Sequence, residues 1–248
     1  MSATLPSALS PRPLNAMIPF RDNIPSRRYS FVTAGLILAN AVTFLYELSL
    51  SPEDLRALID TSGVTPTRLS MTGQGPVENV GVFVASSLSG MFLHGGWFHL
   101  IGNMWYLWIF GDNVEDRIGH LRFLIFYLLC GALASLSHIL FNLGSSVPSV
   151  GASGAVAGVL GAYLIRYPFA RVLTLVPLFL IWPVVELPAV LVLGFWFLVQ
   201  LLNGTASVAV ASETAGGIAW WAHIRGFLAG IVLIMMLAKA PERRYYWE

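Results

Sequence analysis

Long apolar stretches alternate with short polar connections along most of the chain. Six stretches are apolar enough to predict helices that cross a lipid bilayer, which requires about 20 predominantly apolar residues. They lie at Val32–Leu50, Trp97–Phe110, Leu121–Leu143, Ser153–Tyr167, Leu187–Asn203 and Ala219–Ala238. The second and fourth are short, and turns or buried backbone in Gly90–Gly96 and Val147–Gly151 extend them. The pattern predicts an all-α, polytopic membrane protein with a bundle of six transmembrane helices.

The first connection, Ser51–Ser89, is long and is predicted to be an ordered external loop rather than a second domain. Ser51 is suited to cap a short helix, because Pro52 and two acidic residues follow it. Gly63 is expected to end that helix. Its apolar face predicts that it lies on or dips into the outer leaflet.

Two further connections differ in character. The polar segment Gly111–Gly119 is predicted to be an internal loop in which Asp112 or Asn113 caps a helix. The apolar segment Val172–Val185 contains two prolines, which interrupt a helical hydrogen-bond ladder. We expect it to form a membrane-surface or re-entrant connection.

The composition supports a lipid environment. Of 248 residues, 56% are hydrophobic and 11% are charged, whereas a soluble domain usually carries about 25% charged residues. This excludes an ordinary cytosolic enzyme. The net charge of +1 provides no basic field for nucleic acid. Cys130 is the only cysteine, which excludes a disulfide framework and a cysteine-rich metal site.

Positive charges predict the orientation. Eleven Lys and Arg residues lie in the two tails and the even-numbered connections, against two in the odd-numbered connections. By the positive-inside rule, both termini are cytoplasmic in a multi-pass protein of the cell (inner) membrane. The predicted organisation is a cytoplasmic tail (1–30), a membrane domain (31–238) and a second cytoplasmic tail (239–248). The first tail lacks the apolar core of a signal peptide.

Glycines recur at helical spacing on the fourth and sixth predicted helices. The residues are Gly154, Gly158 and Gly161 on one, and Gly226 and Gly230 on the other. Such faces let two helix backbones approach closely in lipid. If they pack together, Ser153 meets His223, and a serine bonded to a neutral imidazole is an activated nucleophile. Small-residue packing and an interfacial histidine are the structural alternatives.

A second polar cluster lies on the second helix. His99 and Asn103 are four residues apart and therefore share one helix face. At the depth of Ser153 they could stabilise an oxyanion, together with the backbone N–H of Ser153. Hydrogen bonding between helices is the alternative. His94 and His99 are five apart without an H-E-x-x-H motif, so we predict neither a metal site nor a cofactor.

Four segments in this order resemble the rhomboid intramembrane serine proteases of the bacterial six-helix kind. They are HGGWFHLIGN (94–103), FGDNVEDRIG (110–119), GASGAVAGVLGAYL (151–164) and AHIRGFLAG (222–230). The tail segment MIPFRDNIPSRR (17–28) is similar to members of that group, and the resemblance covers about residues 17–238.

The resemblance implies a role for each site residue. It implies that Ser153 is the nucleophile and His223 the general base. It further implies that His99 and Asn103 are oxyanion donors, while His94, Gly151 and Gly154 line the site. Family members cleave transmembrane helices of other proteins near the outer interface, so the implied partners are transmembrane substrates and the lipid bilayer.

Charged side chains on the sixth helix and near the dyad shape two further expectations. Arg225 departs from the family pattern and is expected to face lipid or the fifth helix, where it could pair with Glu213. The fourth and sixth helices contain no Asp or Glu. We therefore expect a Ser–His dyad whose imidazole is oriented by packing, a hydroxyl or a carbonyl.

Polar residues near the external helix ends predict a hydrophilic cavity open to that side. The fifth helix carries Phe195, Trp196 and Phe197, and we interpret it as a lipid-facing candidate for lateral substrate entry.

Two other function classes stay open. An inert rhomboid-like protein that binds membrane clients would normally lack Ser153 or His223. A transporter or channel would carry polar residues along the full depth of several helices. Substrate identity and oligomeric state cannot be read from the chain.

Overall fold

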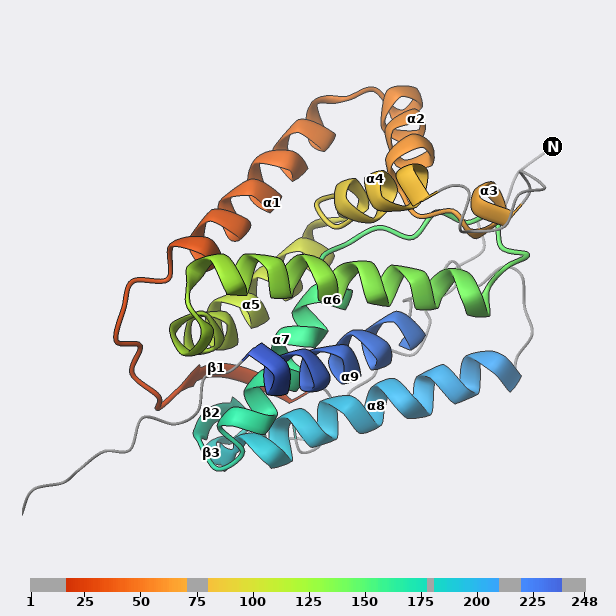
Figure 1. Cartoon of the computed structure of the whole chain (residues 1–248). Coiled ribbons are helices and arrows are strands. Elements are labelled where there is room, and N and C mark those ends of the chain that lie inside the picture. Colours follow the sequence, from red (N-terminus) through yellow and green to blue (C-terminus); the bar gives the residue numbers. More distant parts are fainter. Residues whose placement is uncertain (1–16, 71–79, 178–180, 210–219, 238–248) are drawn as a thin grey trace, which may run out of the picture.

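The computed structural model of the protein describes residues 17–70, 80–177, 181–209 and 220–237. Within these ranges the chain is mainly helical, with a small sheet at one end of the bundle (Figure 1). The helices are α1 (Phe31–Ser49), α2 (Pro52–Ser62), α3 (Pro66–Ser70), α4 (Val80–Gly90), α5 (Trp97–Ile118), α6 (His120–Phe141), α7 (Ser153–Arg166), α8 (Ala189–Ala209) and α9 (Trp220–Leu237). The strands are β1 (Ile18–Asp22), β2 (Arg171–Leu175) and β3 (Val184–Pro188).

Four helices of the described chain, α1, α6, α8 and α9, are long and apolar enough to cross a membrane. The other two predicted spans correspond to α5 and α7. Helix α5 has 22 residues but is charged toward its C-terminus, and α7 has only 14 residues. The protein is therefore a mostly helical, multi-pass membrane protein, and the count of six spans stays a prediction.

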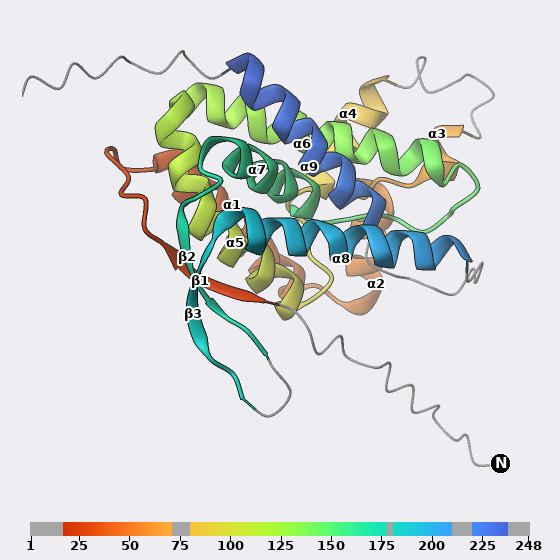
Figure 2. The ribbon, with the colours of Figure 1, turned by 90° about the horizontal axis from the view of Figure 1, so that it is seen from below.

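Helix α7 lies inside the bundle, against α5, α6, α8 and α9 (Figures 1 and 2). Every residue from Gly154 to Tyr163 is buried. A helix that is apolar all round is suited to such a position, because it has no polar face to solvate. The surrounding helices consequently hold Ser153, the first residue of α7, on a rigid element.

The glycines of α7 and α9 face one another. A Cβ atom added to Gly226 would lie 2.9 Å from the carbonyl carbon of Gly154, and one added to Gly230 would lie 2.5 Å from that of Gly158. Both distances are far below van der Waals contact. The two backbones therefore touch directly, as small residues permit between membrane helices.

The predicted loop at Gly111–Gly119 is wrong. Helix α5 continues to Ile118, so neither Asp112 nor Asn113 caps a helix there. Although these residues are polar, Asn113 and Glu115 are only 1% and 0% exposed. Both side chains form hydrogen bonds with other segments of the chain. The local sequence pattern does not reveal those partners.

Glu115 caps α1 from another helix. Its carboxylate accepts hydrogen bonds from the backbone N–H groups of Val32 (2.9 Å) and Thr33 (2.7 Å) and from the Thr33 hydroxyl (2.7 Å). The first N–H groups of a helix have no partner within it. His120 Nδ1 lies 2.6 Å from the same carboxylate. This cluster fixes the start of α1 against the α5–α6 corner.

The expectation of an all-α protein needs correction, because β1, β2 and β3 form an antiparallel sheet in that order. The segment Val172–Val185, predicted as a membrane-surface or re-entrant connection, contains most of β2 and the start of β3. Alternate residues of β2 are buried, as expected for a strand with one covered face. Figure 2 shows the β2–β3 hairpin extending away from the helices. The predicted N-terminal tail supplies β1.

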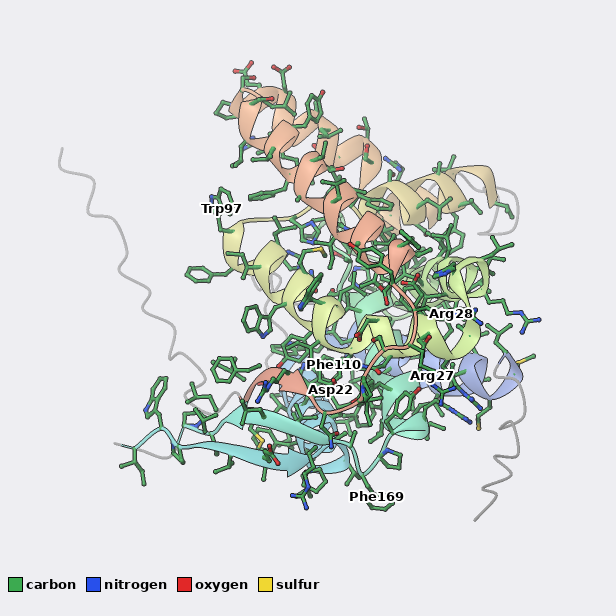
Figure 3. The ribbon with its side chains drawn as sticks, turned by 90° about the vertical axis from the view of Figure 1, so that its left-hand side faces the viewer. Asp22, Arg27, Arg28, Trp97, Phe110 and Phe169 are labelled. Carbon is green, nitrogen blue, oxygen red and sulfur yellow. The ribbon has the colours of Figure 1, made fainter. Side chains whose placement is uncertain are left out.

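Strand β1 is fastened to α5 and α7. The Trp105 indole N–H donates to the Pro19 carbonyl at 2.6 Å. The Asp22 carboxylate accepts hydrogen bonds from the Asn113 amide at 2.9 Å and from the Tyr163 hydroxyl. Figure 3 shows Asp22 near Phe110, at the opposite end of α5 from Trp97. The N-terminal segment is therefore part of the folded bundle.

The first connection follows the prediction only in part. Helix α2 begins after Ser51, whose hydroxyl accepts the Asp54 N–H at 3.1 Å, and it ends before Gly63, as predicted. Helix α4 was not predicted, because its short apolar sequence was assigned to the loop. It ends at Gly90, immediately before the segment that leads to α5.

This connection also supports the segment that precedes α7. Val64 and Ser149 exchange two backbone hydrogen bonds of 3.0 and 2.9 Å. The N–H of Gly151 donates to the carbonyl of Gly90 at 2.8 Å. The approach to Ser153 is consequently held by backbone bonds from two parts of the connection.

The contact between α7 and α9 predicts that Gly226→Val lowers the melting temperature in detergent. The added side chain meets backbone, which cannot rotate away, and overpacking typically costs about 1–3 kcal/mol. Gly226→Ala should have a smaller effect. Gly35→Val is the matched control, because a Cβ atom at Gly35 of α1 meets nothing within 4 Å. An unchanged melting temperature for Gly226→Val would show that the contact is not tight.

The environment of Asp22 predicts a pH-dependent stability. Burial raises the pKa of Asp22 from 3.8 to about 6; the Tyr163 hydrogen bond opposes the shift and the Asp112 carboxylate adds to it. The folded state thus favours the protonated form, and this residue's contribution to stability falls as pH rises from about 4 to above 6. Asp22→Asn cannot ionise, so its melting temperature relative to wild type should increase over that range.

The control for this experiment is Asp60→Asn, which removes an exposed carboxylate of α2. Measured between pH 5 and 7.5, its difference from wild type is the baseline for removing one carboxylate. A constant difference for Asp22→Asn over the same range would contradict the raised pKa.

Candidate active site

A cavity of about 710 Å³ lies among α5, α6, α7, α8 and α9, next to the segment that precedes α7. Its wall is mostly apolar, and a small set of polar side chains converges on it. These polar side chains include His99, Asn103, Ser135, His138, Ser153, Gln200 and His223. A mostly apolar cavity with few convergent polar groups is typical of a binding or catalytic site.

Ser153 enters the cavity from the N-terminus of α7. The preceding Gly151 has φ = 122°, a conformation that favours glycine. A Cβ atom at Gly151 would also lie 2.6 Å from His99 Nε2. Glycine is therefore required at this position for two reasons, and its absence of a side chain lets the His99 ring approach the start of α7.

His223 reaches the same cavity from α9. Its Nδ1 atom is 2.9 Å from the amide oxygen of Gln200 on α8. Within the described chain, the Ser153 hydroxyl makes no direct hydrogen bond with His223, although both side chains line the cavity. Such bonds are often long in a free enzyme and shorten when substrate is bound.

The ring of His99 has a defined proton position. The Gly95 N–H donates to His99 Nδ1 at 3.4 Å. Because a neutral imidazole carries one proton, this bond leaves the proton on Nε2. That atom faces Gly151, so His99 presents an N–H donor close to the start of α7.

Asn103 is held by a chain of buried polar groups. Its amide donates to His94 Nε2 at 3.2 Å, so the proton of the neutral His94 ring is on Nδ1, which lies 3.3 Å from the Phe92 carbonyl. The Glu47 carboxylate accepts the His94 backbone N–H at 3.2 Å. Burial, together with a smaller contribution from nearby His99, lowers the pKa of His94, which lies in the loop before α5, to about 4.

The structure brings most of the predicted site residues together. Residues that line the cavity are Ser153, His223, His99, Asn103, Gly151 and Gly154. His94 is set behind them, against Asn103 and with its ring 5.0 Å from that of His99. The remaining predicted glycines, Gly158, Gly161, Gly226 and Gly230, lie between α7 and its neighbours.

Two expectations about aromatic and charged side chains need correction. Arg225 contacts α6 rather than the fifth helix: its guanidinium lies 3.4 Å from the Phe141 ring centroid and donates to the Ser137 carbonyl at 3.2 Å. The proposed partner Glu213 lies outside the described residues. Trp196, expected to face lipid, lines the cavity instead. The direction of each side chain depends on helix rotation, which apolar composition does not define.

Three further polar residues were missed in the sequence. Gln200 bonds His223, Glu47 bonds the His94 backbone, and the Nε2 atom of His138 is buried without a hydrogen-bond partner among the described residues. Gln200 and Glu47 each interrupt an apolar helix, and polar residues inside membrane helices are often functional. That signal could have identified both. Among the described residues, no group of three His, Cys, Asp or Glu side chains could hold a metal ion.

Comparison with known proteins relates this arrangement to one family. The family described as Rhomboid domain matches residues 84–240. The chain is 30% identical over 162 residues to Rhomboid-like protein 11, chloroplastic, and 33% identical over 165 residues to RHOMBOID-like protein 6, mitochondrial, both of Arabidopsis thaliana. It is 32% identical over 165 residues to Rhomboid protein 1, mitochondrial, of Saccharomyces cerevisiae.

The matched regions cover 62%, 65% and 64% of this chain and 53%, 45% and 43% of the three relatives, respectively. The chain thus spans about half the length of these relatives.

Proposed function

The chain belongs to the rhomboid family, and on this premise we propose that it is an intramembrane serine endopeptidase that cleaves transmembrane helices of other membrane proteins. The observation that carries the proposal is the shared cavity of Ser153 and His223. Ser153 belongs to α7 and His223 to α9, and these two helices are in direct contact at their glycines. The chain retains both residues, which distinguishes this proposal from the alternative of an inert client-binding protein.

In the proposed reaction, Ser153 Oγ attacks the carbonyl carbon of the scissile peptide while its proton passes to His223 Nε2. The tetrahedral intermediate collapses as His223 gives that proton to the leaving amine. An acyl ester then remains on Ser153. Water, deprotonated by His223, hydrolyses the ester, and the serine hydroxyl and the neutral imidazole are restored.

Three donors would stabilise the oxyanion of the intermediate. They are the backbone N–H of Ser153 at the start of α7, Nε2–H of His99 and the second amide hydrogen of Asn103. The N-terminus of α7 adds the positive end of a helix dipole. Donors held in position before the reaction lower its barrier because they need no reorganisation as charge develops. The His94–Asn103 hydrogen bond supports this role, since it fixes the amide.

We further propose six spanning helices, formed by α1, α5, α6, α7, α8 and α9, with both termini on the cytoplasmic side of the cell membrane. The excess of Lys and Arg near the termini supports this orientation. The cavity then lies toward the outer side, where a client helix would be cleaved. The words chloroplastic and mitochondrial in the relatives' names apply to those proteins and are not part of this proposal.

Ser153→Ala should abolish cleavage of a model transmembrane substrate and labelling by a serine-reactive phosphonate. The reason is the loss of the attacking oxygen, and the helical circular-dichroism spectrum should not change. Ser135→Ala, which removes another hydroxyl from the same cavity, is the matched control and should still be labelled. Cleavage by Ser153→Ala within tenfold of wild type would exclude Ser153 as the nucleophile. Absence of labelling and cleavage in wild type would favour the inert alternative.

Asn103→Ala should lower kcat by about 10²–10³, the usual cost of removing one oxyanion donor. KM should change little, because the interaction strengthens only as charge develops. The comparison is Asn142→Ala, which removes an amide that follows α6, donates to the His138 carbonyl and does not line the cavity. Wild-type kcat in Asn103→Ala would show that the amide is purely structural.

A further inference from the structure

Gln200 is a buried polar residue in the apolar helix α8. It is 5% exposed, and its Oε1 atom lies 2.9 Å from Nδ1 of His223 on the neighbouring helix. Asn203, the next polar residue of α8, instead donates to the Val199 carbonyl of its own helix at 2.8 Å. Gln200 therefore links α8 to the proposed base, whereas Asn203 does not.

The chemistry of the two groups defines where the imidazole proton is. An amide oxygen can only accept a hydrogen bond, so Nδ1 of His223 must be protonated. A neutral imidazole carries one proton, which leaves a lone pair on Nε2. Nε2 is the atom that must accept the proton of Ser153. The other tautomer would place a hydrogen there and could not act as a base.

Two aromatic rings lie near the imidazole, Trp196 from the same face of α8 and Trp220 from α9. Trp196 is four residues before Gln200 and therefore one turn away on that face. Its ring lies 6.1 Å from the His223 ring and stacks at 5.9 Å on Phe227 of α9. Trp220 approaches His223 edge-on at 6.3 Å. Trp196 thus supports the ring, while Gln200 holds its Nδ1 atom.

We propose that Gln200 is a positioning residue for the general base. Its amide oxygen selects the productive tautomer of His223 and stabilises the imidazolium that forms when Ser153 loses its proton. The inference rests on the proposed function. A neutral amide can do this inside the membrane without the cost of a buried carboxylate. Because base and acceptor lie on different helices, an α8 displaced by about 1 Å would lower the rate.

The first test compares Gln200→Leu with Asn203→Leu, which makes the same change of polarity on α8 away from His223. Loss of a hydrogen bond to a group that becomes charged typically costs about 10- to 100-fold. Gln200→Leu should therefore lower kcat by this factor with little change in KM. Asn203→Leu should keep wild-type kcat.

The second test uses the pH profile, which a packing role would not alter. Gln200→Glu keeps an oxygen acceptor but places a carboxylate beside Nδ1, which favours the imidazolium. The acidic limb of kcat/KM against pH should move to higher pH than in wild type, and activity at alkaline pH should exceed that of Gln200→Leu. An unshifted profile would overturn the proposal.

The third test does not depend on activity. Nitrogen NMR of ¹⁵N-histidine-labelled protein in detergent, with His223 assigned by its substitution with glutamine, reports which ring nitrogen is protonated. Wild type should show a protonated Nδ1, and Gln200→Leu should show the other tautomer or a mixture. A wild-type His223 ring protonated on Nε2 would overturn the proposal. This result needs only the wild-type protein, so it holds even if Gln200→Leu does not fold.

These measurements distinguish a failure of the positioning role of Gln200 from a failure of the proposed function. If wild type cleaves and is labelled at Ser153 while Gln200→Leu matches it in kcat and pH profile, this inference fails and the proposed function stands. If wild type neither cleaves nor is labelled, the proposed function fails, and with it the role of Gln200 in catalysis. The NMR spectrum would still show whether Gln200 holds the tautomer.

Discussion

Direct contact between the backbones of α7 and α9 is the constraint on which the rest of the structure depends. Gly226 lies against Gly154, and Gly230 lies against Gly158, with no room for a side chain at either position of α9. This contact brings the start of α7 and the start of α9 into one cavity. Any larger residue would separate the two polar side chains that the proposed reaction needs.

Buried carboxylates fasten α1 at both of its ends. Glu115 of α5 accepts the N–H groups at the start of α1, and Glu47 near the end of α1 accepts the N–H of His94. Burying a carboxylate is costly unless donors satisfy it, so each pair fixes one geometry. The second pair also supports Asn103 through His94. The same type of interaction therefore anchors the bundle at one end and orders the candidate site at the other.

Most of the architecture follows from sequence patterns. Apolar length located the six main helices to within a few residues, apart from the C-terminal extensions of α5 and α8, because burial in lipid requires long apolar segments. The cap at Ser51 and the end at Gly63 follow from local backbone chemistry. Motif order indicated the family, which the comparisons confirm. The spacing of glycines also predicted which faces of α7 and α9 meet, since small residues have few other uses in series on one helix face.

Other features depended on contacts between distant segments. The polar residues of Gly111–Gly119 looked like a loop, yet α5 continues to Ile118, and its polar side chains bond to Asp22 of β1 and Thr33 of α1. The sheet depends on the pairing of β2 with both β1 and β3. The local hydropathy pattern does not predict which strands pair. Gln200 was visible as a polar residue in an apolar helix, but only the rotation of α8 against α9 directs it at His223. The sequence alone determined where the six main helices lie, apart from the ends of α5 and α8, and which residues could react. Tertiary packing decided their partners, the helical state of residues 111–118 and the pairing of the strands, because these depend on hydrogen bonds between groups that are far apart along the chain.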